Sequence, residues 1–257
     1  MDLNVTLVQT PLHWQDPAAN RRMLAEKFNR LSAPTDLIVL PEMFTTGFTM
    51  AAPELAETMT GPTLSWLAKQ AQKHQVVITG SLIVAESDQY YNRLVWMRPD
   101  GSYEFYDKRH LFRMAGEHHT YASGQERLIV ELKGWRICPL VCYDLRFPVW
   151  SRNQDPGYDL LVYVANWPEK RCLAWKTLLQ ARAIENLAYV AGVNRTGEDG
   201  KGICYVGDSV VHAPNGQVLW HQSGKEVSPT LCLERQGLED LRASFPAHLD
   251  ADLFRLG

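Results

Sequence analysis

Short apolar runs with β propensity alternate along this chain with longer amphipathic stretches, and this alternation limits the fold more than any other sequence feature. Several runs are apolar at every position, which is typical of strands that are covered on both faces. We expect strands at Asn4–Val8, Leu37–Leu40, Val76–Ser81, Leu94–Met97, Arg136–Val141, Leu160–Val164 and Tyr189–Gly192. The alternation therefore predicts an α/β domain with a mixed sheet under helical cover.

Three stretches carry the period and the end signals of helices. The first has Asp16 as its N-cap and Pro17 at the first helical position, and it runs to about Leu31. The other two are Pro62–His74 and Cys172–Leu187. Chemistry in such a layout is expected in the loops that follow strand ends.

The last part of the pattern is a hairpin. Gly207–His212 and Gln217–Trp220 flank the turn signal Ala213-Pro214-Asn215-Gly216. No linker or repeat divides the chain, so we expect one domain over residues 1–257. With 46% apolar and 21% charged residues, a chain of 257 residues can bury a core without disulfide or metal support.

Charge and hydropathy exclude several classes of protein. The net charge is −3 and no basic run is present, which argues against nucleic-acid binding. No apolar stretch approaches the roughly 18 residues that a membrane-spanning helix needs. The first residues lack the positive region and apolar core of a signal peptide, so we expect a cytoplasmic protein.

The five cysteines are expected to be free thiols. An odd number of cysteines in a reducing compartment argues against a disulfide framework. Cys138 and Cys142 are the one plausible pair, but four steps along a strand separate them by roughly 13 Å, which is too far for a disulfide. The others are Cys172, Cys204 and Cys232.

Ionisable side chains follow two of the expected strands at the point where each strand stops. The run LIVL leads into Pro41-Glu42, and RICPLV leads into Cys142-Tyr143-Asp144. A third segment, FYDKRHL over residues 105–111, combines aromatic and charged residues. Taken singly, a buried small cysteine, a solvated glutamate and a solvated turn would explain them.

Taken together, LPE, YDKRHLF and CYDLRFP occur in the order of the three signature motifs of the nitrilase superfamily, which the chain resembles. The resemblance extends to later blocks, and it spans the first strand to about residue 220. These blocks are Asn166-Trp167-Pro168, Ala183-Ile184-Glu185-Asn186, Tyr189-Val190, Asn194-Arg195, Gly207-Asp208-Ser209 and Pro214-Asn215-Gly216.

The resemblance implies a four-layer α-β-β-α sandwich with mixed sheets and a triad of Glu42, Lys108 and Cys142. A thiol is a poor nucleophile until it is deprotonated, so Cys142 needs a base and a positive environment. Glu42 would take the proton, return it to the leaving ammonia, and then activate water. Lys108 and the backbone N–H of Tyr143 would stabilise the oxyanion. No metal or organic cofactor is implied.

Glu117 resembles a second glutamate of the family, which implies that it orients Lys108 and the substrate; an acid in a surface loop is the alternative. His110, His118, His119, Cys138 and Cys142 are also residue types that bind metals. Their spacing matches neither His-x-x-x-His on a helix nor Cys-x-x-Cys, so we expect no metal site. No local signature nominates a histidine for a Cys–His hydrolase.

The motifs are most similar to those of the omega-amidase branch, which implies a small-molecule substrate: the monoamide of a short 2-oxo dicarboxylic acid. Such a substrate needs a cation opposite its carboxylate, and Arg146 suits bidentate binding. Burial of that charge would make its loss cost about 2–5 kcal/mol. The alternative is that Arg146 pairs with an internal acid. Arg113 is the second candidate for the cation, and the apolar walls are expected from Tyr106, Phe112, Tyr143 and Trp167.

Two departures from relatives affect the pocket rather than the triad. Val149 follows Phe147-Pro148 where many relatives have glutamate, and Arg113-Met114-Ala115 replaces an acidic, proline-containing stretch. A carbamoyl or aliphatic amide hydrolase of the same superfamily is therefore a second hypothesis. A catalytically inactive binding protein is a third, and the intact triad argues against it.

The resemblance also implies a homodimer and amide disposal linked to transamination, as in methionine salvage.

Overall fold

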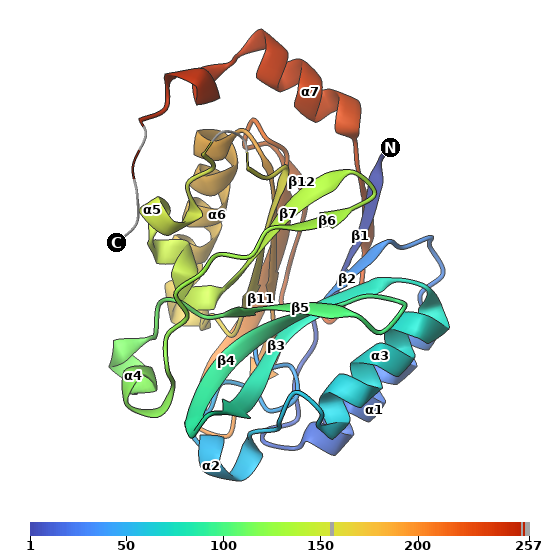
Figure 1. The fold of residues 1–257 in the computed structure, drawn as a ribbon, viewed down its shortest axis with the longest axis vertical. Coiled ribbons are helices and arrows are strands. Elements are labelled where there is room, and N and C mark those ends of the chain that lie inside the picture. Colours follow the sequence, from blue (N-terminus) through green and yellow to red (C-terminus); the bar gives the residue numbers. More distant parts are fainter. Residues whose placement is uncertain (155–156, 253, 255–257) are drawn as a thin grey trace.

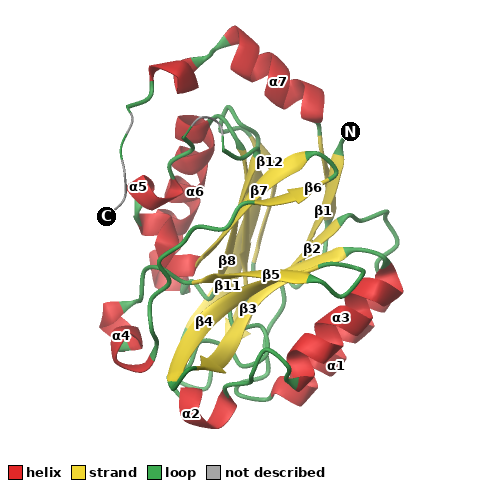
Figure 2. Cartoon of the chain, in the orientation of Figure 1, coloured by secondary structure: helices red, strands yellow, loops and turns green. Residues whose placement is uncertain are grey.

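The computed structural model describes residues 1–154, 157–252 and 254. They form two mixed sheets that face each other, with helices on the outer side of each sheet (Figures 1 and 2). The strands are β1 (Leu3–Leu7), β2 (Leu37–Val39), β3 (Val77–Glu86), β4 (Gln89–Met97), β5 (Tyr103–Asp107), β6 (Val130–Leu132), β7 (Trp135–Val141), β8 (Leu160–Ala165), β9 (Tyr189–Asn194), β10 (Thr196–Glu198), β11 (Cys204–His212), β12 (Val218–Ser223) and β13 (Thr230–Leu233).

Among the described residues, four α-helices have ten or more residues, and the other helices are short. The α-helices are α1 (Pro17–Asn29), α2 (Ala52–Leu55), α3 (Pro62–His74), α4 (Glu117–Thr120), α5 (Pro148–Ser151), α6 (Cys172–Asn186) and α7 (Arg235–Ser244). The 3-10 helices are η1 (Arg113–Ala115), η2 (Cys142–Arg146), η3 (Glu169–Arg171) and η4 (Ala247–Asp250).

The first sheet has the strand order β13-β1-β2-β3-β4-β5, with β1, β2 and β3 parallel. Its two faces pack on different partners because side chains alternate along a strand. In β2, Leu37 and Val39 lie in the core between the sheets, whereas Ile38 packs towards α1 and α3. This double burial explains why the strand is apolar at every position.

The second sheet has the order β10-β11-β9-β8-β7-β6, with β12 paired to β11. Helix α6 packs against its outer face (Figure 1). The packing is close at Gly192 on β9, where an added Cβ would lie 2.5 Å from a methyl group of Leu179 and 2.9 Å from the Trp175 ring. The α-β-β-α sandwich that the resemblance implied is confirmed.

The seven expected strands, the three long helices and the late hairpin are all present, with ends shifted by a few residues. The single mixed sheet expected from the alternation was wrong, because strand pattern does not reveal which strands pair. The turn between β3 and β4 was not predicted. It is made by Ser87 and Asp88, both with positive φ, and neither is the glycine or asparagine typical of such a turn.

Across the described residues, no helix is long and apolar enough to cross a membrane.

Candidate active site

Four polar residues lie within three residues of the ends of strands from both sheets. Glu42 follows β2 and Lys108 follows β5 in the first sheet, whereas Cys142 follows β7 and Asn166 follows β8 in the second. All four line one cavity of about 260 Å³. The site is therefore assembled from both halves of the sandwich.

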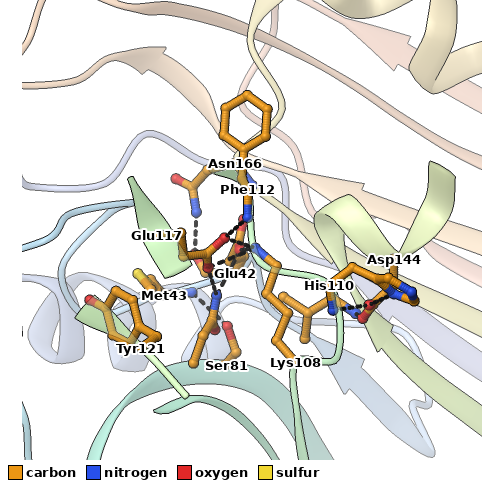
Figure 3. Close-up of polar contacts among 12 residues, drawn as sticks. Glu42, Met43, Ser81, Lys108, His110, Phe112, Glu117, Tyr121, Asp144 and Asn166 are labelled. Atoms are coloured by element: carbon orange, nitrogen blue, oxygen red, sulfur yellow. Dashed lines mark hydrogen bonds and ion pairs between the residues drawn. The ribbon is translucent and has the colours of Figure 1, made fainter. Parts of the chain in front are cut away.

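The ammonium group of Lys108 lies between two carboxylates (Figure 3). Its Nζ is 2.9 Å from Glu42 Oε1 and 2.9 and 3.0 Å from the two oxygens of Glu117. All three side chains are at most 1% exposed. Burial alone would lower the pKa of Lys108, but the charges of Glu117 and Glu42 outweigh it and hold that pKa well above its usual value. The two carboxylates therefore favour the charged form of Lys108.

Glu42 is held in place by two asparagines that the sequence did not nominate. The backbone N–H of Asn166 donates to Glu42 Oε2 at 2.9 Å, and Asn92 Nδ2 donates to Oε1 at 2.8 Å. The Asn166 side chain also donates to the Glu42 carbonyl oxygen at 2.5 Å. Asn92 comes from β4 and is fully buried. These bonds leave Glu42 little freedom to move.

Glu117 lies beside Lys108, at the start of α4, and is not a solvated loop acid. Burial raises its pKa, the Lys108 charge opposes this rise, and the Glu42 charge adds to it. Glu117 Oε2 also accepts a hydrogen bond of 2.5 Å from the backbone N–H of Phe112. The geometry ties Lys108 to the loop that forms one wall of the cavity.

Cys142 is half-buried and has a φ of +46°, a left-handed conformation that few residues other than glycine adopt. The turn places the residue at the end of β7, against the cavity. Burial raises the pKa of the thiol well above its usual value and the Glu42 charge raises it further, whereas Lys108 lowers it. The resting group is a thiol, so a base is required to activate it.

Four of the predicted binding residues line the cavity. They are Phe112, Tyr143, Arg146 and Trp167. The rings of Phe112 and Tyr143 meet edge-on with centroids 5.0 Å apart, and the Arg146 guanidinium lies 5.0 Å from the Trp167 ring centroid.

Two of the expected binding residues do not line the cavity. Tyr106 lies in the core between the sheets, 1% exposed, and its hydroxyl donates to Asp144 at 2.7 Å. It points inward because alternate residues of β5 face the core. Arg113 is exposed in η1, and its neighbours Met114 and Ala115 line the cavity in its place.

The candidate metal ligands do not gather. Among the described residues, no three His, Cys, Asp or Glu side chains form a group that could hold a metal ion. Cys138 is fully buried in β7, and the rings of His118 and His119 lie with centroids 3.8 Å apart and planes tilted by 40° in α4. All five cysteines are free thiols, as expected.

The sequence profile of the carbon-nitrogen hydrolase family matches residues 4–233. This chain belongs to that family. It is 49% identical to omega-amidase YafV of Escherichia coli K12, over 99% of this chain and 98% of the relative. It is 34% identical to 2-oxoglutaramate amidase of Bacillus subtilis, over 97% and 98% of the two chains.

Solved structures agree with this family membership. The crystal structure of XC1258 from Xanthomonas campestris, a CN-hydrolase superfamily protein with an arsenic adduct in its active site, superposes with a TM-score of 0.98 at 49% identity and covers 100% of both chains. Nit3 of Saccharomyces cerevisiae, a nitrilase-superfamily member, shares the fold with a TM-score of 0.86 at 23% identity, over 95% of this chain and 94% of Nit3. This carbon-nitrogen hydrolase is an amidase acting on non-peptide C–N bonds.

Charge substitutions in the amidase should move the reactivity of Cys142 in opposite directions. Glu42→Gln removes a charge that raises the thiol pKa, so the thiolate fraction at pH 8 and the rate of alkylation by iodoacetamide should both increase. Lys108→Met removes a charge that lowers this pKa and should slow alkylation. Peptide-resolved mass spectrometry measures both rates, with exposed Cys204 as internal reference. Rates that shift in the same direction would contradict this electrostatic account.

Proposed function

We propose that this amidase is an omega-amidase, which hydrolyses the terminal carboxamide of 2-oxoglutaramate or 2-oxosuccinamate and releases ammonia. The observation that carries the proposal is the buried Glu42–Lys108–Glu117 cluster, of which Glu42 and Lys108 line one cavity together with Cys142. The names of the omega-amidase and 2-oxoglutaramate amidase relatives support the choice of substrate.

In the first half of the proposed reaction, Glu42 accepts the thiol proton while Cys142 Sγ attacks the amide carbon. The developing oxyanion is stabilised by Lys108 and by the backbone N–H of Tyr143. Glu42 then gives its proton to the leaving nitrogen, the C–N bond breaks, and ammonia departs from a thioester. Glu117 keeps Lys108 oriented through its two carboxylate oxygens.

In the second half, Glu42 removes a proton from water, which attacks the thioester carbon. The C–S bond breaks, the proton returns to the Cys142 sulfur, and the dicarboxylic acid leaves. Glu42 thus alternates between base and acid, which its fixed position beside Lys108 allows. The reaction consumes one water and uses no cofactor.

The cations that line the cavity favour an anionic substrate. These four are Arg146, Lys170, Arg171 and Lys201, and the acids in the lining are Asp199 and Glu42, which is paired with Lys108. Within the described residues, none of the four cations forms an ion pair with a carboxylate, which argues against the internal pairing considered for Arg146. Asp199 is engaged by the Tyr205 hydroxyl and by backbone N–H groups. A cavity lining with a net positive charge is a suitable site for a substrate carboxylate.

A panel of small amides tests the substrate assignment. Ammonia release from 2-oxoglutaramate should exceed release from an N-carbamoyl amino acid and from butyramide at equal concentrations. Preference for the carbamoyl compound or for butyramide would place the enzyme in another branch of the superfamily. Absence of ammonia from every compound would favour a binding protein that retains only the fold.

Replacing Arg146 should separate charged from neutral substrates. The guanidinium is exposed rather than buried, so solvent screens it, and we expect a loss smaller than the cost of a buried charge. Arg146→Leu should lower kcat/KM for 2-oxoglutaramate about tenfold, or about 1.4 kcal/mol. Turnover of butyramide should change less than about twofold, and Arg146→Lys should recover part of the loss. Equal losses on both substrates would make Arg146 structural, and half-buried Arg171 would be tested next.

We also propose that the chain acts as a homodimer of single-domain subunits in the cytoplasm, in amide disposal linked to transamination such as methionine salvage. Exposed apolar side chains support a dimer: Val149 on α5, and Leu173 and Ile184 on α6, are each at least half exposed. Five free thiols suit a reducing compartment. Light scattering coupled to size-exclusion chromatography tests the dimer.

A further inference from the structure

A further buried carboxylate, Asp144, lies two residues beyond the nucleophile and accepts four hydrogen bonds. Its Oδ1 accepts from the His110 backbone N–H at 3.0 Å and lies 2.8 Å from His110 Nδ1 (Figure 3). Its Oδ2 accepts from the Tyr106 hydroxyl at 2.7 Å and from the Val141 backbone N–H at 3.0 Å. Asp144 is 0% exposed and does not line the substrate cavity.

These partners flank both reacting motifs. Tyr106 and His110 stand two residues before and two residues after Lys108, and they belong to the end of β5 and the loop beyond it. Val141 is the last residue of β7 and directly precedes Cys142. One carboxylate therefore joins the lysine segment of the first sheet to the cysteine turn of the second.

The Tyr106 hydroxyl strengthens this connection. It also accepts hydrogen bonds from the Arg109 backbone N–H at 3.1 Å and from Trp150 Nε1 at 3.0 Å. Burial and the Asp144 charge raise the pKa of Tyr106, so the hydroxyl keeps the proton that it donates. The His110 ring stacks on Phe147 of the cysteine motif with centroids 3.7 Å apart.

The bond from Val141 to Asp144 also spans the strained residue. A non-glycine residue with φ of +46° costs on the order of 1–3 kcal/mol, and it persists only where surrounding contacts hold it. The Asp144 carboxylate closes a ring across Cys142 and Tyr143 by accepting from the N–H just before them. This contact fixes the direction of the thiol and of the Tyr143 N–H.

We propose that Asp144 is a positioning residue, which sets the distance between Lys108 and Cys142 through its bonds to Tyr106, His110 and Val141. It touches no reacting atom and acts through the two residues that do. The inference rests on the proposed function only for the substrate used to measure turnover. The geometric coupling itself does not depend on which amide is hydrolysed.

Asp144→Asn tests the coupling with almost no change in volume. Each oxygen of Asp144 faces a backbone N–H, from His110 on one side and Val141 on the other. Either orientation of an asparagine amide therefore sets its NH₂ group against one of these donors. We expect kcat to fall at least tenfold while KM changes less than about twofold. Both constants are measured well below the melting temperature of the variant.

Asp159→Asn is the matched control. Asp159 is also buried and accepts from the Arg136 backbone N–H and from the guanidinium groups of Arg235 and Arg242, far from the cavity lining. Its loss should lower the melting temperature and leave kcat within about twofold. Wild-type kcat in folded Asp144→Asn, or an equal kcat loss in Asp159→Asn, would overturn the proposal.

Two milder variants keep the test decisive if Asp144→Asn does not fold. Tyr106→Phe removes the hydroxyl with its three hydrogen bonds, and His110→Ala removes the ring that contacts Asp144 and stacks on Phe147. Both retain the backbone bonds to Asp144, so each should lower kcat several-fold with KM nearly unchanged. Wild-type kcat in both would overturn the proposal.

The wild-type enzyme is assayed first on the amide panel. If it prefers another amide, the omega-amidase assignment fails, and the variants are compared on that amide instead.

Discussion

Cys142→Ala is expected to reduce ammonia release from 2-oxoglutaramate to the rate without enzyme, with little change in melting temperature. The substitution removes the only atom that can form the thioester, whereas alanine occupies slightly less space in a half-buried turn. Ammonia release and thermal unfolding by circular dichroism measure the two effects. In the wild-type protein, rapid quenching and mass spectrometry should find the acyl group on the peptide that contains Cys142.

Cys138→Ala provides the control for loss of a nearby thiol, from the strand that leads to Cys142. Cys138 is fully buried four residues earlier in β7, and burial raises its pKa to about 12, so it is inert at neutral pH. We expect this variant to be less stable and fully active. Ammonia release by Cys142→Ala, or an acyl group on another cysteine, would refute the assignment of the nucleophile.

Glu42→Gln and Lys108→Met are each expected to lower kcat by about a hundredfold or more, the scale for loss of a general base or an oxyanion donor. Lys108→Met also leaves the buried carboxylates of Glu42 and Glu117 without their shared cation. Because the groups act on the same thiol, the double variant should lose far less than the product of the single losses. Single-turnover kinetics on all three variants measure this coupling.

Arg93→Met serves as the control for removal of a buried cation from the same sheet. Arg93 is 1% exposed on β4 and pairs with Asp107, the residue before Lys108, and with Glu86. Its loss should destabilise the protein but retain most of kcat. Fully multiplicative losses for Glu42 and Lys108, or an equal loss for Arg93→Met, would indicate that the effects on kcat come from the fold rather than from a shared site.

The sequence predicted the triad because Glu42 and Cys142 each follow an apolar strand and because all three members belong to motifs of recognisable order. It did not predict Asn92 or Asn166 as the contacts of Glu42. Asn92 stands inside β4, in a stretch whose polar residues gave no sign of burial. A buried asparagine and an exposed one have the same local signature, because burial at that position is decided by the opposite sheet.

Tyr106 illustrates a second limit. Neighbouring Phe105 and Tyr106 are both aromatic, and alternation along a strand requires only that they face opposite sides. In the structure Phe105 is 44% exposed and packs on Arg93, whereas Tyr106 enters the core. Arg146 shows the same limit for charge, since neither its exposure nor its contact with Trp167 follows from local sequence. The packing of the two sheets decides the outcome for Tyr106, and the packing of the segments after β7 and β8 decides it for Arg146.

The pairing of β1 with β13 has a consequence for how the chain folds during synthesis. Leu3 lies opposite Leu233, so the first sheet joins residues from near the two ends of the described chain. One edge of β1 remains without its neighbour until translation has passed residue 230, and an open strand edge can pair with other chains. Such distant pairing also slows folding, because a long loop must close first. The nascent enzyme therefore depends on its last strand to protect its first.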